Sequence, residues 1–261
     1  SNRNVNEMSA PIPSLLAIGA IHSALNKRGL RAQTSLVVEA GDVIEVHHFA
    51  TLIGFGANAI NPYLAGDSLR AMYVEELEEG TTTIKKLLSN YNKSIDAGLL
   101  KVFSKMGIST IQSYHGAQIF EAIGISNEVI DKCFNGTVSK IKGMSFDDLS
   151  KEALIKHQRA FSSNPEELHL SVGGYYQWKR KGEVHLFNPE TIHWLQKSTR
   201  LNDYGMYEQY AEAINNQMKK NITLRSLLKF KKGNSIPLSE VESAENIFKR
   251  FATGAMSFGS I

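Results

Sequence analysis

The chain has 261 residues, of which 42% are hydrophobic and 21% charged, an ordinary composition for a globular protein with a sizeable core. The net charge of +3 gives no electrostatic case for nucleic-acid binding, and no apolar run approaches the roughly 18 residues of a membrane helix. The single cysteine, Cys133, excludes internal disulfides and four-cysteine metal sites within this sequence, and it favours a reducing, cytoplasmic setting.

The first sixty residues predict a strand–helix–strand unit. A helix is expected over Leu15–Leu25, with Ser14 as its cap and a face of small residues for close packing. The β-branched run 34–39 predicts a buried strand, residues 46–54 a helix, and residues 56–62 a second strand. This order is typical of a parallel sheet.

The next segment predicts a second unit of the same kind. Residues 66–106 read as two helices that meet near Gly80, the second of them capped by Thr81 to Thr83. A strand over Met106–Ile111, a loop over Ser113–Gly116 and a helix over Ala117–Ile123 are then expected.

The last part of the chain has a different character. Ser145 with Asp148 predicts a capping box for a helix that runs to about Phe161, and residues 175–187 predict a β-hairpin. One helix is expected to begin at Asn188–Glu190, a second to span 204–219 and a third to end near Arg250. A buried strand is expected to follow the third helix.

These expectations define an α/β fold class: an incomplete or irregular βα-barrel-like domain with parallel strands, a hairpin and C-terminal helices. We divide it into a βαβ-type core over 1–140, a helical and hairpin extension over 141–250, and a strand of a further domain over 251–261. The polar start without an initiator methionine and the strand-like end indicate a piece of a larger protein.

Several candidate sites favour structural interpretations. Adjacent histidines such as His47 and His48 point about 100° apart on a helix, so we expect one to pack and the other to be solvated or hydrogen-bonded, without a shared metal. Cys133 lies in an apolar helical context, which favours a buried thiol over a nucleophile. The loop Ser113–Gly116 could bind an anion at a helix N-terminus, but a simple connection is the preferred interpretation.

The best ligand candidate is the terminal run Gly254–Ser260. Small residues at the end of a strand allow a flat cofactor or a phosphate to approach the backbone, although small residues can also serve strand packing.

Four parts of the chain carry a recognisable pattern: Arg3–Glu7 with Ile12–His22, Glu45–Tyr63, Gly98–Glu121 and Arg250–Ser260. The first three, in the family's order, resemble the central domain of the large chain of glutamate synthase, and the last resembles the first strand of that family's FMN-binding barrel.

The resemblance implies a parent enzyme that makes two L-glutamate from L-glutamine and 2-oxoglutarate. In this family, ammonia released by an N-terminal amidotransferase domain passes through a tunnel to the FMN domain. A 3Fe-4S cluster relays electrons from NADPH, NADH or ferredoxin. The central domain connects the two active sites. This chain lacks the family's N-terminal nucleophilic cysteine and the three cysteines of the cluster.

The residues that match the flavin-facing strand are Ala255, Met256, Ser257 and Gly259, so the resemblance implies FMN contacts there in the intact parent only. We expect no catalytic or metal-binding residue and no FMN binding by the chain alone. We also expect unusually apolar surfaces where the missing amidotransferase and FMN domains would meet it. In the parent, the resemblance implies an electron-donor subunit or ferredoxin as a further partner.

Two other interpretations stay open at this point. The chain could be a standalone βα-barrel enzyme with its site at Ser113–Gly116, although only three parallel strands and the terminal run are found where a barrel needs eight. It could also be an interaction module that uses the acidic stretch Glu75–Glu79 or the basic loop Lys229–Lys232, although exposed charge runs are usually solvated faces.

Overall fold

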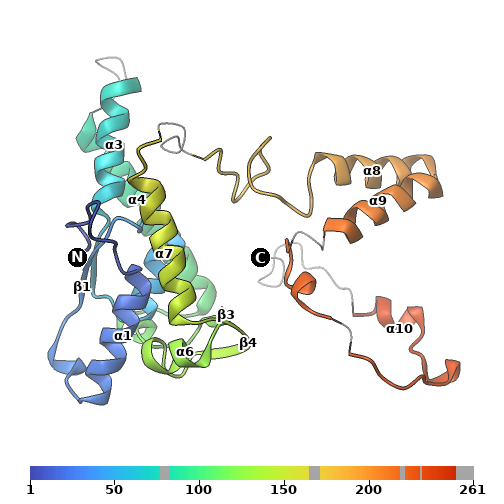
Figure 1. Cartoon of the computed structure of the whole chain (residues 1–261), viewed down its shortest axis with the longest axis horizontal. Coiled ribbons are helices and arrows are strands. Elements are labelled where there is room, and N and C mark those ends of the chain that lie inside the picture. The colour runs from blue at the N-terminus through green and yellow to red at the C-terminus, as the bar shows by residue number, and fades with distance from the viewer. Residues whose placement is uncertain (77–82, 165–170, 218–220, 230, 251–261) are drawn as a thin grey trace. The chain divides into compact units, whose positions relative to one another are not determined.

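The computed structural model describes residues 1–76, 83–164, 171–217, 221–229 and 231–250. The chain divides into two compact units, 1–168 and 169–261, which are considered separately below (Figure 1). The expected division at 140 and 250 stays a prediction.

The first unit is built on the expected strand–helix–strand core. Strands β1 (Val37–Glu39) and β2 (Ala59–Asn61) pair in parallel, with Val38 opposite Ile60, and α2 (Val46–Gly54) connects them. A buried cluster that includes Val43, Phe49 and Leu52 lies beneath them. The bounds of α2 agree with the prediction because Glu45 and His48 form a capping box at its start and Gly56, at φ 108°, turns the chain after it.

Helix α1 (Ser14–Lys27) confirms the first predicted helix, but its cap is different. Pro13 is the N-cap residue, and Ser14 is the first helical residue. The carboxylate of Asp42, in the loop after β1, accepts hydrogen bonds from the Ser14 backbone N–H (3.0 Å) and hydroxyl. An acidic side chain from another part of the chain therefore fulfils the role expected of Ser14.

Helix α1 packs closely against α6 (Asn127–Cys133), and Gly19 and Ser23 of α1 lie at this contact. An added Cβ at Gly19 would lie 2.5 Å from the Cys133 carbonyl oxygen, and the Ser23 hydroxyl donates to that same oxygen at 3.2 Å. A small-residue face was expected, but Ala24 is exposed while Gly19 and Ser23 are buried.

Helices α3 (Tyr63–Glu76) and α4 (Ile84–Met106) confirm the predicted helical pair. Thr83 caps α4 as expected, by accepting from the Lys86 N–H at 3.2 Å. Gly107, at φ 68°, ends α4 with a left-handed C-cap.

The predicted strand Met106–Ile111 and the predicted helix Ala117–Ile123 are both wrong. Thr110 caps a one-turn helix, α5 (Ile111–Tyr114), and the following segment forms strand β3 (Glu121–Ile125). Strand β3 pairs in parallel with β4 (Val138–Met144), with register shifts, and α6 lies between them in the sequence. A second strand–helix–strand unit is therefore present, but it begins later than the apolar pattern indicated.

Helix α7 (Phe146–Ala160) begins with the predicted capping box: the Asp148 N–H donates to the Ser145 hydroxyl, and the Ser145 N–H donates to the Asp148 carboxylate at 2.9 Å. Farther along, the His157 ring bonds the Asn6 carbonyl oxygen at 2.8 Å and so connects α7 to the N-terminal segment.

The second unit contains a helical hairpin and shorter turns. Helix α8 (Pro189–Leu201) starts at the predicted Asn188 cap, and α9 (Tyr204–Gln217) follows a left-handed Asn202. The remaining elements are α10 (Ala244–Phe248), capped by Ser243 as predicted, and the short 3-10 segments η4 (Leu224–Leu227) and η5 (Leu238–Glu240).

The hairpin expected over 175–187 is wrong. In that range the structure has bends and a turn, with Lys181 at φ 63° and the Gly182 N–H donating to Lys179 O at 2.9 Å. Tyr175 is 72% exposed, so burial of its ring contributes little to this segment. Alternation of apolar and polar residues in the sequence is not enough to stabilise an isolated two-stranded hairpin.

The fold class is confirmed as irregular α/β. Over the residues that the structure describes, the strands form two separate parallel pairs and no closed barrel. The standalone-barrel interpretation therefore loses its structural basis. The expected terminal strand lies outside the described residues.

Candidate functional site

The residues that the resemblance assigns to FMN, namely Ala255, Met256, Ser257 and Gly259, lie outside the described residues. Their assignment stays a prediction. The acidic stretch Glu75–Glu79 also lies largely outside them, and Lys229, Lys231 and Lys232 are exposed, as expected for a solvated face.

The loop predicted at Ser113–Gly116 is partly helical. Ser113 and Tyr114 belong to α5, whose single turn is too short to present an anion site. Tyr114 is fully buried against Phe103, and burial raises the pKa of its phenol to about 12. The Gly116 N–H donates to Gly54 O at 2.8 Å, which connects this turn to the end of α2. These contacts favour a packing role.

A cluster of two histidines and an arginine is the polar centre of the first unit. Arg31 donates from Nε to His22 Nδ1 at 3.0 Å and from Nη2 to Gly56 O at 2.7 Å. It also donates to Asn58 Oδ1 at 3.1 Å and to the Thr34 carbonyl oxygen. The guanidinium therefore joins the end of α1 to the turn between α2 and β2.

The hydrogen bond from Arg31 determines which nitrogen of neutral His22 carries the proton. Because Arg31 donates to Nδ1 of His22, the proton of the neutral ring is on Nε2. Burial lowers the pKa of His22, and the charge of Arg31 and the neighbouring His115 lower it further. Burial also lowers the pKa of His115, against a hydrogen bond to the Ala57 backbone that raises it. The Nε2 atom of His115 is buried without a partner among the described residues.

This cluster predicts a pH-dependent stability. Protonation of either ring is disfavoured in the folded state, so the unfolded chain binds more protons below its ordinary histidine pKa of about 6.5. The free energy of unfolding should be constant between pH 7 and 8 and should fall from pH 6.5 to 5. Urea unfolding at these pH values checks this. His22→Gln should flatten the dependence, and the exposed control His193→Gln should not.

A hollow of about 580 Å³ lies beside the cluster, lined among others by His22, His115, Phe55 and Cys133. Cys133 is buried, and burial raises the pKa of its thiol, so the thiol is protonated at neutral pH. It is a packing residue, as the sequence predicted. Among the described residues, no group of three metal-ligating side chains could hold a metal ion.

The adjacent histidines behave as expected. The backbone N–H groups of Ile44 and Glu45 donate to His48 Nδ1 at 3.1 and 3.4 Å, while His47 packs edge-on against Phe120 with ring centroids 6.3 Å apart. One ring is hydrogen-bonded and the other packs.

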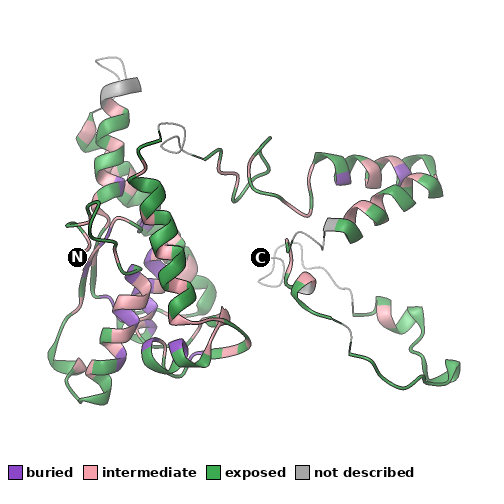
Figure 2. Cartoon of the chain, in the orientation of Figure 1, coloured by how far each residue is buried: buried purple, intermediate pink, exposed green. Residues whose placement is uncertain are grey.

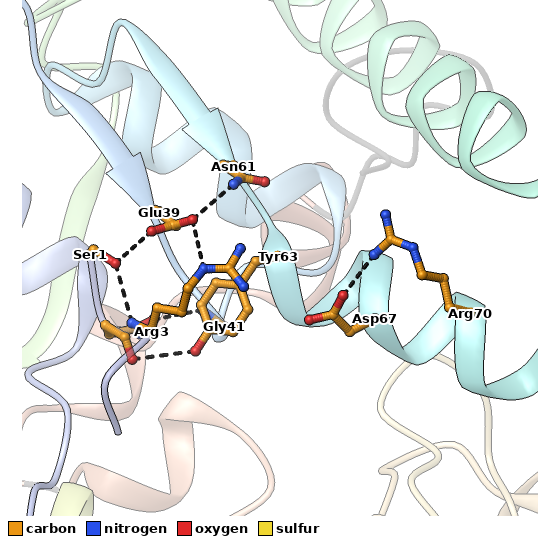
Figure 3. Close-up of polar contacts among 9 residues, drawn as sticks. Ser1, Arg3, Glu39, Gly41, Asn61, Tyr63, Asp67 and Arg70 are labelled. Atoms are coloured by element: carbon orange, nitrogen blue, oxygen red, sulfur yellow. Dashed lines mark hydrogen bonds and ion pairs between the residues drawn. The ribbon is translucent and has the colours of Figure 1, made fainter. Parts of the chain in front are cut away.

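The carboxyl ends of β1 and β2 form the second polar cluster, shown in Figure 3. The Glu39 carboxylate accepts hydrogen bonds from the Ser1 hydroxyl (2.7 Å), Arg3 Nε (2.9 Å) and Asn61 Nδ2 (3.1 Å). The Ser1 and Arg3 hydrogen bonds lower the pKa of Glu39 most. The Arg3 guanidinium also lies over the Tyr63 ring, 4.3 Å from its centroid.

This edge is where open α/β sheets bind ligands, but here the chain's own N-terminal residues fill it. The backbone of Asn2 donates to Glu39 O at 3.1 Å, and its side chain accepts from the Gly41 N–H at 3.0 Å. The cluster therefore anchors the N-terminal segment. Sequence reasoning missed Glu39 and Asn61, although a polar residue directly after each predicted strand was the available signal.

None of the described helices combines the length and the apolar character that a bilayer span requires. The arrangement of the described residues thus provides packing, anchoring and one polar centre.

Comparison with known proteins gives two family matches. Residues 1–126 match the glutamate synthase central domain, and residues 185–261 match a conserved region in glutamate synthase. The chain is 49% identical over 265 residues to the glutamate synthase (NADPH) large chain of Bacillus subtilis. It is 41% identical to the glutamate synthase (NADH) of Schizosaccharomyces pombe and 42% identical to the ferredoxin-dependent glutamate synthase of Cyanidium caldarium.

These alignments cover nearly all of this chain but little of the relatives. They include 100%, 100% and 96% of the present sequence, and only 17%, 12% and 16% of the three relatives. The chain thus spans about a sixth or less of the length of the proteins it matches.

Proposed function

Because the chain belongs to the glutamate synthase family, we propose that it connects the amidotransferase and FMN-binding domains of a glutamate synthase large chain and is inactive alone. The observation that carries this proposal is the similarity over the whole sequence, with the central-domain match first and the conserved-region match second.

The complete enzyme of this proposal combines L-glutamine, 2-oxoglutarate, two electrons and two protons to give two L-glutamate. It takes ammonia from glutamine in one domain and delivers it to another. FMN and a 3Fe-4S cluster would supply the electron transfer when bound. The single cysteine cannot provide the three thiolates of such a cluster, so any cluster belongs to another part of the enzyme.

The flavin contacts proposed for Ala255, Met256, Ser257 and Gly259 rest on their place in the terminal run that resembles the first barrel strand. This region does not distinguish between electron donors, because relatives named for NADPH, NADH and ferredoxin all match across it. A cytoplasmic setting rests on the single cysteine.

Both units have many exposed residues (Figure 2), and large apolar side chains are among them. In the first unit Met8, Ile12 and Val37 are 91%, 66% and 69% exposed, and in the second unit Leu238 is 86% exposed. Contiguous apolar patches are typical of surfaces that other protein parts cover, and we propose that these side chains belong to such patches.

A flavin titration tests whether the chain has a site of its own. Purified chain is added stepwise to FMN until the two are equimolar, and the quenching of flavin fluorescence is measured at each step. The proposal predicts unchanged fluorescence, because the rest of the flavin-binding domain lies outside this sequence. Stoichiometric quenching would show that the chain completes a flavin site alone and would overturn the proposal.

A further inference from the structure

The hollow of about 580 Å³ beside the polar centre is lined by several separate parts of the first unit. They are the end of α1 with Lys27, the turn after α2 with Phe55, the segment before β3 with Gln118 and the turn after α6 with Asn135. Ligand pockets in proteins usually have volumes of about 300–1,000 Å³. The hollow therefore has room for a small molecule.

His115 contributes a buried hydrogen-bond acceptor to the lining. Its ring lines the hollow, and its Nε2 atom is buried without a partner among the described residues. The ring also bonds the Ala57 backbone, and because this bond raises the pKa of His115, the ring is the donor in it. The donating atom must be Nδ1, since Nε2 has no partner. In the neutral ring Nε2 therefore carries the lone pair, and leaving it unpaired costs free energy.

His22 contributes a donor close to this acceptor. Arg31 Nε donates to its Nδ1 at 3.0 Å, so the proton of the neutral ring is on Nε2. A Cβ added at Gly116 would lie 4.0 Å from His22 Nε2, which places this N–H next to the residue that follows His115. Both rings line the hollow, so it offers one donor and one acceptor at neighbouring positions.

The charges around the hollow narrow the choice of ligand. Among the described residues, no Asp or Glu lines it, and Lys27 is the one lysine or arginine that does. A cationic group would therefore meet Lys27, with the Arg31 charge behind His22, and no carboxylate. A carboxylate group would place its lone pairs against the lone pair of His115 Nε2. A metal ion is disfavoured too, because Arg31 occupies the Nδ1 lone pair of His22 and keeps the proton on Nε2.

The rest of the lining combines aromatic rings and amide side chains. Phe55 stacks on Phe120 with ring centroids 5.8 Å apart and meets Phe134 edge-on at 4.9 Å. The amide side chains are those of Asn26, Gln118 and Asn135. Gln118 has a left-handed backbone, at φ 52°, and strained conformations of this kind cluster at ligand sites. Apolar area with a few convergent polar groups is the usual composition of a small-molecule site.

We propose that the hollow binds a small molecule through its primary carboxamide group. The carboxamide nitrogen donates to His115 Nε2, and the carboxamide oxygen accepts from His22 Nε2. Water can form the same two bonds, and a carboxamide can displace water because it reproduces both of them. The proposal goes beyond the connecting role and does not depend on it.

The lining admits two sources of this group. One is the side-chain amide of an amino acid, for which L-glutamine is the probe, with its α-carboxylate near Lys27. The other is an aromatic amide, for which nicotinamide is the probe, with its ring against Phe55 or Phe120. The matching acids, L-glutamate and nicotinate, have nearly the same shape but lack the N–H groups that His115 Nε2 accepts from.

NMR of the 261-residue chain with isotope-labelled histidine rings tests the proposal. Titration with L-glutamine or nicotinamide near neutral pH should give a saturable shift of the His115 Nε2 signal, with half-saturation at about 1 mM. The matching acid should bind at least about 10-fold more weakly. A shift with L-glutamine alone would assign the site to amino-acid amides, and a shift with nicotinamide alone would assign it to aromatic amides. Either result supports the proposal.

Two variants, followed through the His22 ring signals, separate this site from general effects. His115→Phe removes the acceptor and keeps an aromatic ring, so it should weaken binding at least about 10-fold. His193→Phe, at an exposed histidine in the second unit, should leave the half-saturation unchanged. The comparison of each amide with its acid uses the unaltered chain, so it tests the proposal even if His115→Phe does not fold. Equal binding of an amide and its acid, or no saturable shift with either amide up to about 50 mM, would overturn the proposal.

Discussion

Replacing Gly19 with alanine is expected to lower the free energy of unfolding by about 3 kcal/mol. The new Cβ would lie 2.5 Å from the Cys133 carbonyl oxygen and 2.7 Å from the Phe134 ring. The first of these is a backbone atom, so α1 and α6 must separate. The Ser23 hydrogen bond to the same carbonyl, at 3.2 Å, would lengthen with them. Urea unfolding of the two proteins measures the difference.

Gly66 provides the matched control, because it is also a helical glycine. It lies in α3, and the nearest heavy atom to an added Cβ is Arg70 Nη1 at 3.6 Å, an ordinary contact. Gly66→Ala should therefore stabilise the chain by about 0.5–1 kcal/mol through helix propensity. If both variants shifted stability in the same direction, close packing of α1 on α6 would not be the cause.

Replacing Arg31 with methionine is expected to cost about 2 kcal/mol and to raise the pKa of His22. The variant loses the hydrogen bonds to His22 Nδ1, Gly56 O and Asn58 Oδ1. The first two acceptors are left without this donor, while Asn58 Oδ1 still accepts from the Leu36 N–H at 2.9 Å. The positive charge that lowers the pKa of His22 is lost with them. Unfolding curves measure the stability, and NMR titration of the ring protons measures the pKa.

Arg28→Met is the control for this variant. Arg28 is exposed at the end of α1, where its backbone forms the C-cap. Its replacement should change stability by less than about 0.5 kcal/mol and leave the His22 titration in place. A His22 pKa that did not rise in Arg31→Met would contradict the assignment of Arg31 as its electrostatic partner.

Local signals predicted much of the fold. The caps at Thr83, Ser145 and Asn188 and the bounds of α2 follow from residues close in sequence, and the structure confirms them. Where two signals competed, the prediction failed. The apolar run after Met106 suggested a strand, but the left-handed Gly107 and the Thr110 cap end one helix and begin another.

The polar centre could not be predicted from local pattern. Its members, His22, Arg31, Gly56 and His115, are spread over almost a hundred residues, and only tertiary packing brings them together. Gly56 shows this most clearly: it stood at the start of the second predicted strand, but in the structure it turns the chain at φ 108°, and an added Cβ there would clash with the His22 ring. The anchor at Glu39 was closer to prediction, since it ends the first predicted strand.

The most direct test of the central claim is a glutamate synthase assay of an exchange chain, defined as the Bacillus subtilis large chain whose aligned region is replaced by residues 1–261. NADPH oxidation and glutamate formation are followed together in the assembled enzyme. The account predicts that the exchange chain is active, that it forms two L-glutamate for each L-glutamine consumed, and that the isolated 261-residue chain has no activity. A folded exchange chain that binds FMN but forms no glutamate would contradict the account, as would glutamate formation by the isolated chain.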